Sequence, residues 1–273
     1  MNKPSSPAAT VRINTVKRKL LEGKPVFGAE AGMGSALVAE SLAYAGFDFI
    51  QVDNQHGEWS HDRLMHAFRG ICLGGAIPMS RVKSNTYAEI GMIMDLGALG
   101  IVVPMVNSAE EAARVVRAAF YPPFGDRSNG AIGVRIHGTL DEYRAHIREE
   151  ALIMVMIETR EGLERAEQIL SVEGVDGCMI GPSDLGLSLG VPPWSQEHEA
   201  AIDQILKVCR QVGKIPGIAA WGTESNSPAR RAAQGFLFIQ ATSDREIVPR
   251  GASEILAMAR SSGPRAGAPV STY

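Results

Sequence analysis

The most constraining feature of this sequence is a regular alternation of short apolar runs with amphipathic stretches of helical period. Strands that alternate with helices in this way build a parallel sheet, because each helix returns the chain to the same edge of the sheet. The predicted strands cover Val26–Ala29, Phe47–Asp53, Pro78–Val82, Gly100–Val106, Leu152–Glu158, Gly177–Gly181, Pro216–Ala220 and Phe236–Ala241. Eight βα units in 273 residues predict an α/β fold of the (β/α)8 TIM barrel type rather than an open doubly wound sheet.

The predicted barrel leaves a short polar segment at each end of the chain. We expect residues 1–14 to be a flexible N-terminus, residues 15–260 to form a single catalytic barrel domain, and residues 261–273 to be a disordered tail rich in Gly, Pro, Ala and Ser. No Gly-x-Gly-x-x-Gly follows the first predicted strand, so the sequence does not support a dinucleotide-binding fold.

The composition excludes several classes of partner. The net charge is −3, from 27 basic and 30 acidic residues, and no stretch concentrates positive charge, so we expect no nucleic acid partner. No apolar run approaches the roughly 20 residues of a membrane span, so we expect no membrane partner. The first ten residues lack the apolar core of a signal peptide. The three cysteines have no metal-site spacing, and we expect reduced, mostly buried thiols in a cytoplasmic protein.

Several of the predicted strands end in a polar residue suited to chemistry. These residues are Asp53 with His56 just beyond it, Arg81, Glu158, Ser183 with Asp184, and Gln240. The carboxyl ends of parallel strands gather at one face of a barrel, and active sites form there. The pattern therefore predicts one site that combines residues distant in the sequence.

Glu158 and Asp184 form the central pair of this predicted site. They follow neighbouring strands, and no His or Cys lies near either of them in a ligand pattern. Two carboxylates favour a hard divalent ion such as Mg²⁺ or Mn²⁺, with positions left for a chelating 2-oxo acid. Two structural alternatives remain open: Glu158 can pair with Arg81 or Arg160, and Asp184 can cap a helix.

Two further features of the predicted site suit an anionic substrate. Ser183 or Asp184 can begin a short helix, whose free backbone amides favour a substrate carboxylate. Arg81 stays charged and can stabilise an oxyanion or enolate, although an ion pair inside the barrel is an equally simple role.

His56, Asp95 and Trp221 are the remaining candidates. His56 can shuttle protons near neutral pH, and its place on the predicted catalytic face favours that role over a structural one. Asp95 is ambiguous from the residues alone, and Trp221 suits either an acceptor pocket or a cover for the barrel rim. Lys83 is a weak candidate for a Schiff base, because it is followed by a polar loop rather than an apolar pocket.

Motifs spread over roughly residues 28–259 resemble the HpcH/HpaI aldolase family of metal-dependent (class II) pyruvate aldolases. The motifs are Val52-Asp53-Asn54-Gln55-His56-Gly57, Val103-Pro104-Met105-Val106, Tyr121-Pro122-Pro123, Ile157-Glu158-Thr159-Arg160-Glu161 and Gly181-Pro182-Ser183-Asp184-Leu185. Their order along the chain makes the resemblance specific, since each motif alone is weak.

The resemblance implies a (β/α)8 barrel whose C-terminal helix is domain-swapped onto a neighbouring subunit, in dimers that assemble into a hexamer. It also implies a role for each candidate. Glu158 and Asp184 are similar to the metal ligands, Arg81 to the enolate-stabilising arginine, His56 to the base, Asp95 to the acid that orients it, and the amides of Ser183 and Asp184 to the pyruvate carboxylate site.

The resemblance implies a lyase that cleaves a 4-hydroxy-2-oxo acid to pyruvate and an aldehyde, with Mg²⁺, Mn²⁺ or Co²⁺ as cofactor. Two residues depart from the family pattern: Gln55 replaces a glutamate before the histidine, and Met156 replaces a glutamine before the metal glutamate. Two alternatives stay open. One is a related metal-enolate enzyme that decarboxylates oxaloacetate or acts like a citrate synthase, and the other is a non-catalytic protein that binds 2-oxo acids.

Overall fold

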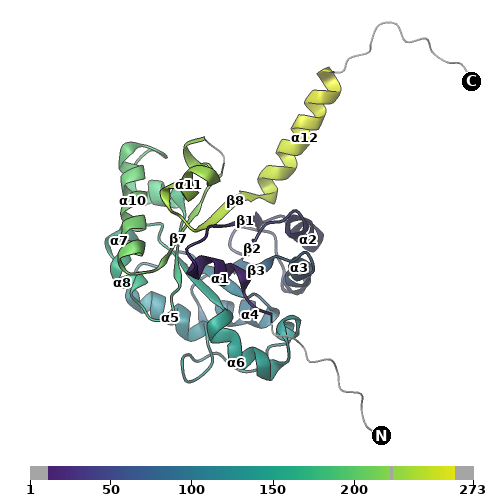
Figure 1. The fold of residues 1–273 in the computed structure, drawn as a ribbon, viewed down its shortest axis with the longest axis vertical. Helices are drawn as coiled ribbons and strands as arrows, with labels where there is room; N and C mark the ends of the chain where they lie inside the picture. Colours follow the sequence, from purple (N-terminus) through teal and green to yellow (C-terminus); the bar gives the residue numbers. More distant parts are fainter. Residues whose placement is uncertain (1–11, 222–223, 262–273) are drawn as a thin grey trace, which may run out of the picture.

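The computed structural model describes residues 12–221 and 224–261 of the chain, and its core is a closed barrel of eight parallel strands. Each strand pairs with the next in sequence, and β8 pairs with β1 to close the barrel (Figure 1). The strands are β1 Val26–Ala31, β2 Phe49–Asp53, β3 Ile77–Arg81, β4 Gly100–Val103, β5 Leu152–Met156, β6 Gly177–Ile180, β7 Ile215–Ala219 and β8 Phe238–Ser243. The predicted TIM barrel is therefore confirmed.

Helices surround the barrel, and most of them begin at a Ser or Thr whose side chain caps the first turn. Ser108, for example, accepts a hydrogen bond from the Glu111 amide at the start of α5. The helices are α1 Thr15–Leu21, α2 Ala36–Tyr44, α3 His61–Leu73, α4 Tyr87–Leu96, α5 Ala109–Ala119, α6 Leu140–Glu150, α7 Arg160–Glu164, α8 Ala166–Leu170, α9 Pro182–Leu189, α10 Gln196–Gln211, α11 Pro228–Gln234 and α12 Asp244–Ser261, with 3-10 turns η1 Gly133–His137 and η2 Glu224–Asn226. Among the described residues, no helix combines the length and the apolar character needed to cross a bilayer.

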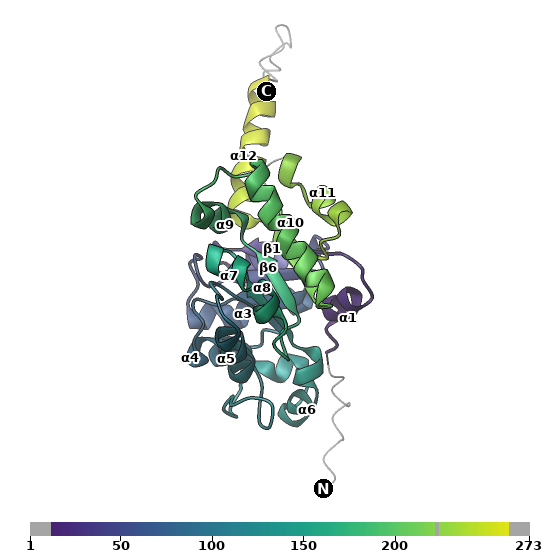
Figure 2. The same cartoon turned by 90° about the vertical axis from the view of Figure 1, so that its left-hand side faces the viewer.

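The last helix, α12, differs from the other helices in its position and its burial. It leaves the barrel after β8 and projects away from it (Figures 1 and 2), and only Asp244 among its residues is buried. The exposed residues of α12 include four large apolar ones, Val248, Ile255, Leu256 and Met258. Within the described residues, therefore, the helix that follows β8 does not pack along the barrel wall.

The sequence located every strand, with errors only at the strand ends. β1 and β8 extend two residues further than predicted, and β4 and β5 stop before Val106 and Glu158. The predicted buried thiols are confirmed, because Cys72, Cys178 and Cys209 are all free and buried. Most of the predicted flexible N-terminus and the tail beyond residue 261 lie outside the described residues.

Candidate active site at the barrel mouth

The carboxyl ends of β2 and β3 bring an acid and an arginine together. Asp53 on β2 pairs with Arg81 on β3. Arg81 Nε donates to Asp53 Oδ1 at 2.8 Å, and Arg81 Nη2 lies 2.8 Å from Asp53 Oδ2. Burial alone would raise the pKa of Asp53, but the hydrogen bond and charge of Arg81 outweigh it and hold this pKa below its usual value. Arg81 therefore stays charged and fixed at the mouth of the barrel.

Glu158 lies just past β5 as a buried carboxylate without an ion-pair partner among the described residues. Its Oε1 accepts a hydrogen bond of 2.8 Å from the Met105 amide. Burial, with a smaller contribution from the nearby charge of Asp184, raises the pKa of Glu158 to about 6 against the opposing effects of the Met105 amide and the Arg81 charge. The structure thus brings both Asp184 and Arg81 within electrostatic reach of Glu158.

A glycine makes room for the Glu158 carboxylate. A Cβ atom at Gly181 would lie 2.5 Å from Glu158 Oε2, closer than real side chains approach. Gly181 is also the N-cap of α9, and its side-chain-free backbone lets the start of this helix approach the carboxylate. The close approach sets the Glu158 carboxylate beside the first turn of α9.

Asp184 lies in the first turn of α9, with its side chain exposed. Helix α9 begins at Pro182, one residue earlier than the sequence suggested, so the amides of Ser183 and Asp184 are first-turn donors without acceptors inside the helix. No side-chain cap bond is present, so the alternative of Asp184 as a helix cap is wrong. The alternative of a Glu158 ion pair with Arg81 or Arg160 is wrong as well.

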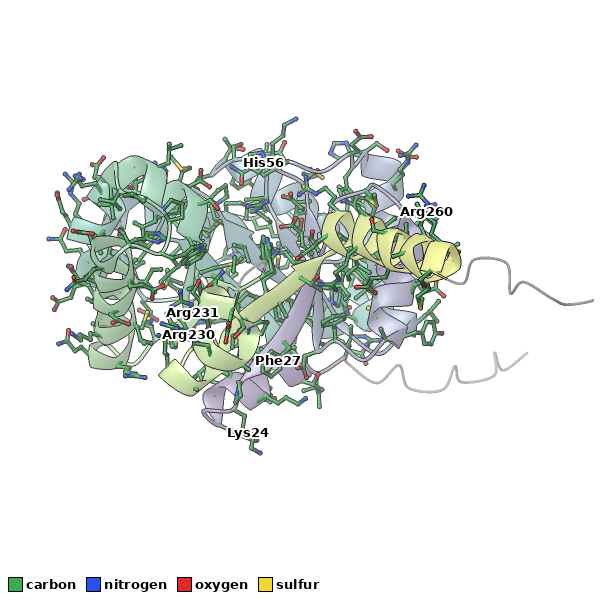
Figure 3. All side chains as sticks on the ribbon, turned by 90° about the horizontal axis from the view of Figure 1, so that it is seen from above. Lys24, Phe27, His56, Arg230, Arg231 and Arg260 are labelled. Atoms are coloured by element: carbon green, nitrogen blue, oxygen red, sulfur yellow. The ribbon has the colours of Figure 1, made fainter. Side chains whose placement is uncertain are left out.

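His56 lies in the turn after β2, at the same end of the barrel as Arg81. Its amide donates to Asp53 Oδ1 at 3.3 Å, and its ring is exposed. Figure 3 shows His56 at the opposite end of the molecule from Lys24, which precedes β1. His56 therefore lies at the carboxyl end of the barrel strands, and its role in catalysis stays a prediction.

The structure does not bring Asp95 to His56 within one chain. Asp95 is close to the end of α4, near the amino end of β4, where the Leu99 amide bonds to the Pro78 carbonyl. Its carboxylate accepts two hydrogen bonds from Arg127, at 2.6 and 2.9 Å. Within one chain, therefore, the predicted pairing of Asp95 with His56 is not formed.

Trp221 follows β7 and is half-buried. It lines a hollow of about 550 Å³ beside β8 and the first turns of α12, together with Phe47, Ile247 and Arg250. The lining residues of this hollow do not include Glu158, Arg81 or His56. Trp221 thus lines a hollow beside the start of α12, and neither Glu158 nor Asp184 lines this hollow.

Sequence reasoning missed two charged residues at the mouth, Glu30 and Arg245. Glu30 lies on β1, just beyond the predicted strand end, and Arg245 is the second residue of α12. Arg245 donates to Glu30 Oε1 at 2.7 Å and to Asp53 Oδ2 at 3.0 Å. Glu30 could have been found from the sequence, because it is the one charged residue in the apolar run from residue 26 to residue 31. No local pattern marks Arg245.

Comparison with known proteins assigns the chain to a family. A family model described as HpcH/HpaI aldolase/citrate lyase matches residues 31–249. The chain belongs to the HpcH/HpaI aldolase/citrate lyase family. A 4-hydroxy-2-oxo-heptane-1,7-dioate aldolase of Escherichia coli is 34% identical to this family member over 248 residues, which cover 89% of the chain and 94% of the relative.

Two solved structures are similar to this one over most of the chain. A family protein from Burkholderia cenocepacia J2315 has a TM-score of 0.82 and 26% identity, over 90% of this chain and 99% of that one. The citrate synthase SbnG has a TM-score of 0.80 and 29% identity, over 92% of this chain and 99% of that one. The predicted family, the barrel fold and the enzyme class, a carbon–carbon lyase, are thereby confirmed.

Proposed function

We propose that this protein is a divalent-metal-dependent aldolase that reversibly cleaves a 4-hydroxy-2-oxo acid to pyruvate and an aldehyde. The observation that carries the proposal is the buried carboxylate of Glu158, which lies near Asp184 and Arg81 and lacks an ion-pair partner in the described chain. The similarity to a 4-hydroxy-2-oxo-heptane-1,7-dioate aldolase along most of both chains supports the choice of aldol chemistry.

Glu158 and Asp184 would hold Mg²⁺, Mn²⁺ or Co²⁺, since carboxylate oxygens suit all three ions. The donor set fits, because a divalent ion would relieve both the burial of Glu158 and its repulsion by Asp184. In the described part of the chain, no cluster of three or more His, Cys, Asp and Glu residues could hold a metal, so water and substrate would complete the coordination. When bound, the cation supplies Lewis acidity toward the ketone of a 2-oxo acid.

The chain's own residues would bind the substrate and move the proton. The amides of Ser183 and Asp184 bind the carboxylate of the 2-oxo acid at the start of α9. In the synthetic direction His56 removes a proton from the methyl group of pyruvate, and Arg81 donates hydrogen bonds to the oxygen of the developing enolate. The enolate carbon attacks the aldehyde, and His56 returns the proton to the new alkoxide. Cleavage is the reverse sequence.

The assembly that we propose is a cytoplasmic homohexamer built from dimers, in which α12 is domain-swapped between subunits. The exposed apolar residues of α12 and its projection from the barrel support a partner for this helix. A neighbouring subunit would also supply Asp95 to orient His56, because in one chain the two residues belong to opposite ends of the barrel. Trp221, beside the first turns of α12, would line the acceptor pocket in such an assembly.

The test of the proposed activity is pyruvate release from a panel of 4-hydroxy-2-oxo acids, measured with and without EDTA. We expect turnover that stops on chelation and returns with excess Mg²⁺ or Mn²⁺. Turnover that is insensitive to the chelator would reject the metal mechanism, and a complete absence of pyruvate release would reject the aldolase.

A second candidate function is a condensation or decarboxylation that uses the same enolate. The similarity to the citrate synthase SbnG, at 29% identity over 92% of the chain, favours it. Oxaloacetate assayed with and without an acceptor separates the two functions. Oxaloacetate turnover faster than aldol cleavage would favour the second candidate. Tight pyruvate binding without exchange of its methyl protons would instead indicate a protein that only binds 2-oxo acids.

A further inference from the structure

Arg81 belongs to a cluster of four charges at the barrel mouth, of which the proposed reaction uses only one. Glu30 accepts hydrogen bonds from Arg245 at 2.7 Å and from Arg81 at 3.4 Å, each on a different oxygen. Asp53 is bonded to the same two arginines, with Arg81 on both of its oxygens and Arg245 on Oδ2. Two carboxylates and two guanidinium groups therefore alternate around a closed ring.

The charges in this ring balance only when Arg245 is present. The side chains of Glu30 and Asp53 are 4% and 0% exposed, and that of Arg81 is 12% exposed. Without Arg245, two buried carboxylates would face a single guanidinium, with a net negative charge left in a site of low dielectric. Such a site would weaken the positive charge that Arg81 offers to a substrate oxygen.

Neighbouring groups hold Glu30 in its orientation. Gln240 Nε2 donates to Glu30 Oε2 at 2.7 Å, and Gln51 Nε2 donates to Gln240 Oε1 at 3.2 Å. All three side chains are buried inside the barrel. The chain of hydrogen bonds fixes one Glu30 oxygen and leaves the other for Arg245.

Arg245 also contacts the turn that carries His56. Its Nη1 donates to the His56 carbonyl at 3.3 Å. A Cβ atom at Gly32 would lie 2.7 Å from Arg245 Nε, so a glycine lets the guanidinium pass the end of β1. The preceding residue, Asp244, accepts hydrogen bonds from the Gly32 and Met33 amides at 2.9 Å each. The first residues of α12 thus join the loop after β1 to the turn after β2.

We propose that Arg245 is a positioning residue that, as a coupled pair with Glu30, holds Arg81 and the His56 turn in place for the reaction. The proposal rests on the proposed function, because it assigns Arg81 and His56 their roles there. Arg245 balances the charge of Glu30, and the bidentate Arg81–Asp53 pair then keeps its own geometry. The Glu30–Arg245 pair works as a unit, so the loss of one partner harms the site more than the loss of both.

The experiment is a double-variant cycle with Arg245→Met, Glu30→Gln and the combined variant, assayed by exchange of pyruvate methyl protons in D2O. We expect Arg245→Met to lower kcat about tenfold with little change in KM, because substrate binding groups are untouched. The double variant should recover to within about threefold of the parent protein, since neither charge is left unpaired. The kcat of Arg245→Lys should lie between those of Arg245→Met and the parent protein, because lysine keeps the positive charge but lacks the planar guanidinium that can bond two acceptors at once.

The matched control is Arg260→Met at the far end of α12 (Figure 3), which makes no ion pair in the described part of the chain and should leave kcat unchanged. Additive losses in the double variant, or full activity of Arg245→Met, would overturn the proposal.

A second readout uses metal-free protein and needs no activity. The urea midpoint should fall in each single variant and recover in the double variant, which reports the coupling of Glu30 and Arg245 directly. If the parent protein exchanges no methyl protons, the proposed function fails, and the urea cycle still decides whether the pair is coupled. A midpoint cycle without coupling would contradict the inference, whatever the activity.

Discussion

Arg81 and Arg127 are two buried arginines held in different ways. Arg81, at the barrel mouth, is bonded to carboxylates on two strands, Glu30 on β1 and Asp53 on β2, and its charge reaches Glu158. Arg127, on the loop before η1, is 1% exposed and lies over the rings of Tyr121 and Tyr143, at 4.7 and 5.4 Å. Its carboxylate partner is Asp95 on α4.

The difference between the two arginines indicates which one serves chemistry. At the mouth, Arg81 is bonded to Asp53 and Glu30 through Nε and Nη2, and no hydrogen bond among the described residues involves its Nη1. Around Arg127, aromatic rings and the Tyr143 hydroxyl, at 3.0 Å, occupy the remaining faces of the guanidinium. A buried arginine that is satisfied on all sides stabilises the fold, whereas one held from a single side remains available to a substrate.

The largest effect that we predict follows from removing Arg81. Arg81→Met should lower kcat for pyruvate release about a thousandfold, because it removes the donor to the enolate oxygen. The unfolding free energy should fall as well, because Arg245 alone is left to face Glu30 and Asp53, so kcat is measured where urea unfolding shows the variant to be fully folded. Steady-state kinetics and urea unfolding on the same preparation measure both quantities. A variant that loses stability and keeps its kcat would reverse the comparison.

The main effect of Arg127→Met should be a loss of stability. We expect the unfolding free energy to fall by about 3 kcal/mol, because the change removes a buried ion pair and two cation–π contacts. Urea unfolding of the metal-free protein measures this loss. Arg117→Met is a matched control, because Arg117 pairs with Asp126 on the surface and should cost less than about 1 kcal/mol. An equal loss in the two variants would show that burial of Arg127 contributes nothing.

The cluster around Arg127 also predicts an acid sensitivity. His137 stacks on Tyr143, and burial lowers the pKa of His137 to about 4. A folded pKa below the unfolded value means that the unfolded chain binds the proton more tightly. Stability is then highest above about pH 6.5 and falls by about 3 kcal/mol as the pH drops toward 4. Urea unfolding across this range should be flatter for His137→Gln than for the parent protein; equal slopes would contradict the prediction.

The mouth should respond to pH with the opposite sign, and more weakly. Because burial raises the pKa of Glu158 to about 6, the folded metal-free protein binds this proton more tightly than the unfolded chain. Stability from Glu158 is therefore present below about pH 4.5 and falls by about 2 kcal/mol as the pH rises to 6. In urea unfolding, Glu158→Gln should remove this pH dependence of stability. A variant with the same pH profile as the parent protein would show that Glu158 is not its source.

The sequence predicted the parts of the site that follow from strand position. Arg81 ends the third apolar run, Glu158 follows the fifth, and Asp184 lies in the first turn of the helix after the sixth, so the barrel alone brings them to one face. The neighbourhood of Arg245 was not predictable, since it depends on the direction in which α12 leaves β8. A local pattern does not encode that direction.

The cluster around Arg127 was also missed, for a related reason. Its contacts join a loop to α4 and α6, and the ring positions of Tyr121 and Tyr143 are fixed only by tertiary packing. The resemblance assigned Asp95 to His56, but one chain places Asp95 beside Arg127. That role stays a prediction about neighbouring subunits.

The central claim is that Glu158 and Asp184 together hold the catalytic cation. An anomalous-scattering map of crystals soaked in Mn²⁺ and pyruvate tests this claim most directly. We predict a peak about 2.0–2.6 Å from an oxygen of each carboxylate, with pyruvate oxygens completing the coordination. A map without a peak between these two residues, from crystals that bind Mn²⁺ elsewhere, would contradict the account.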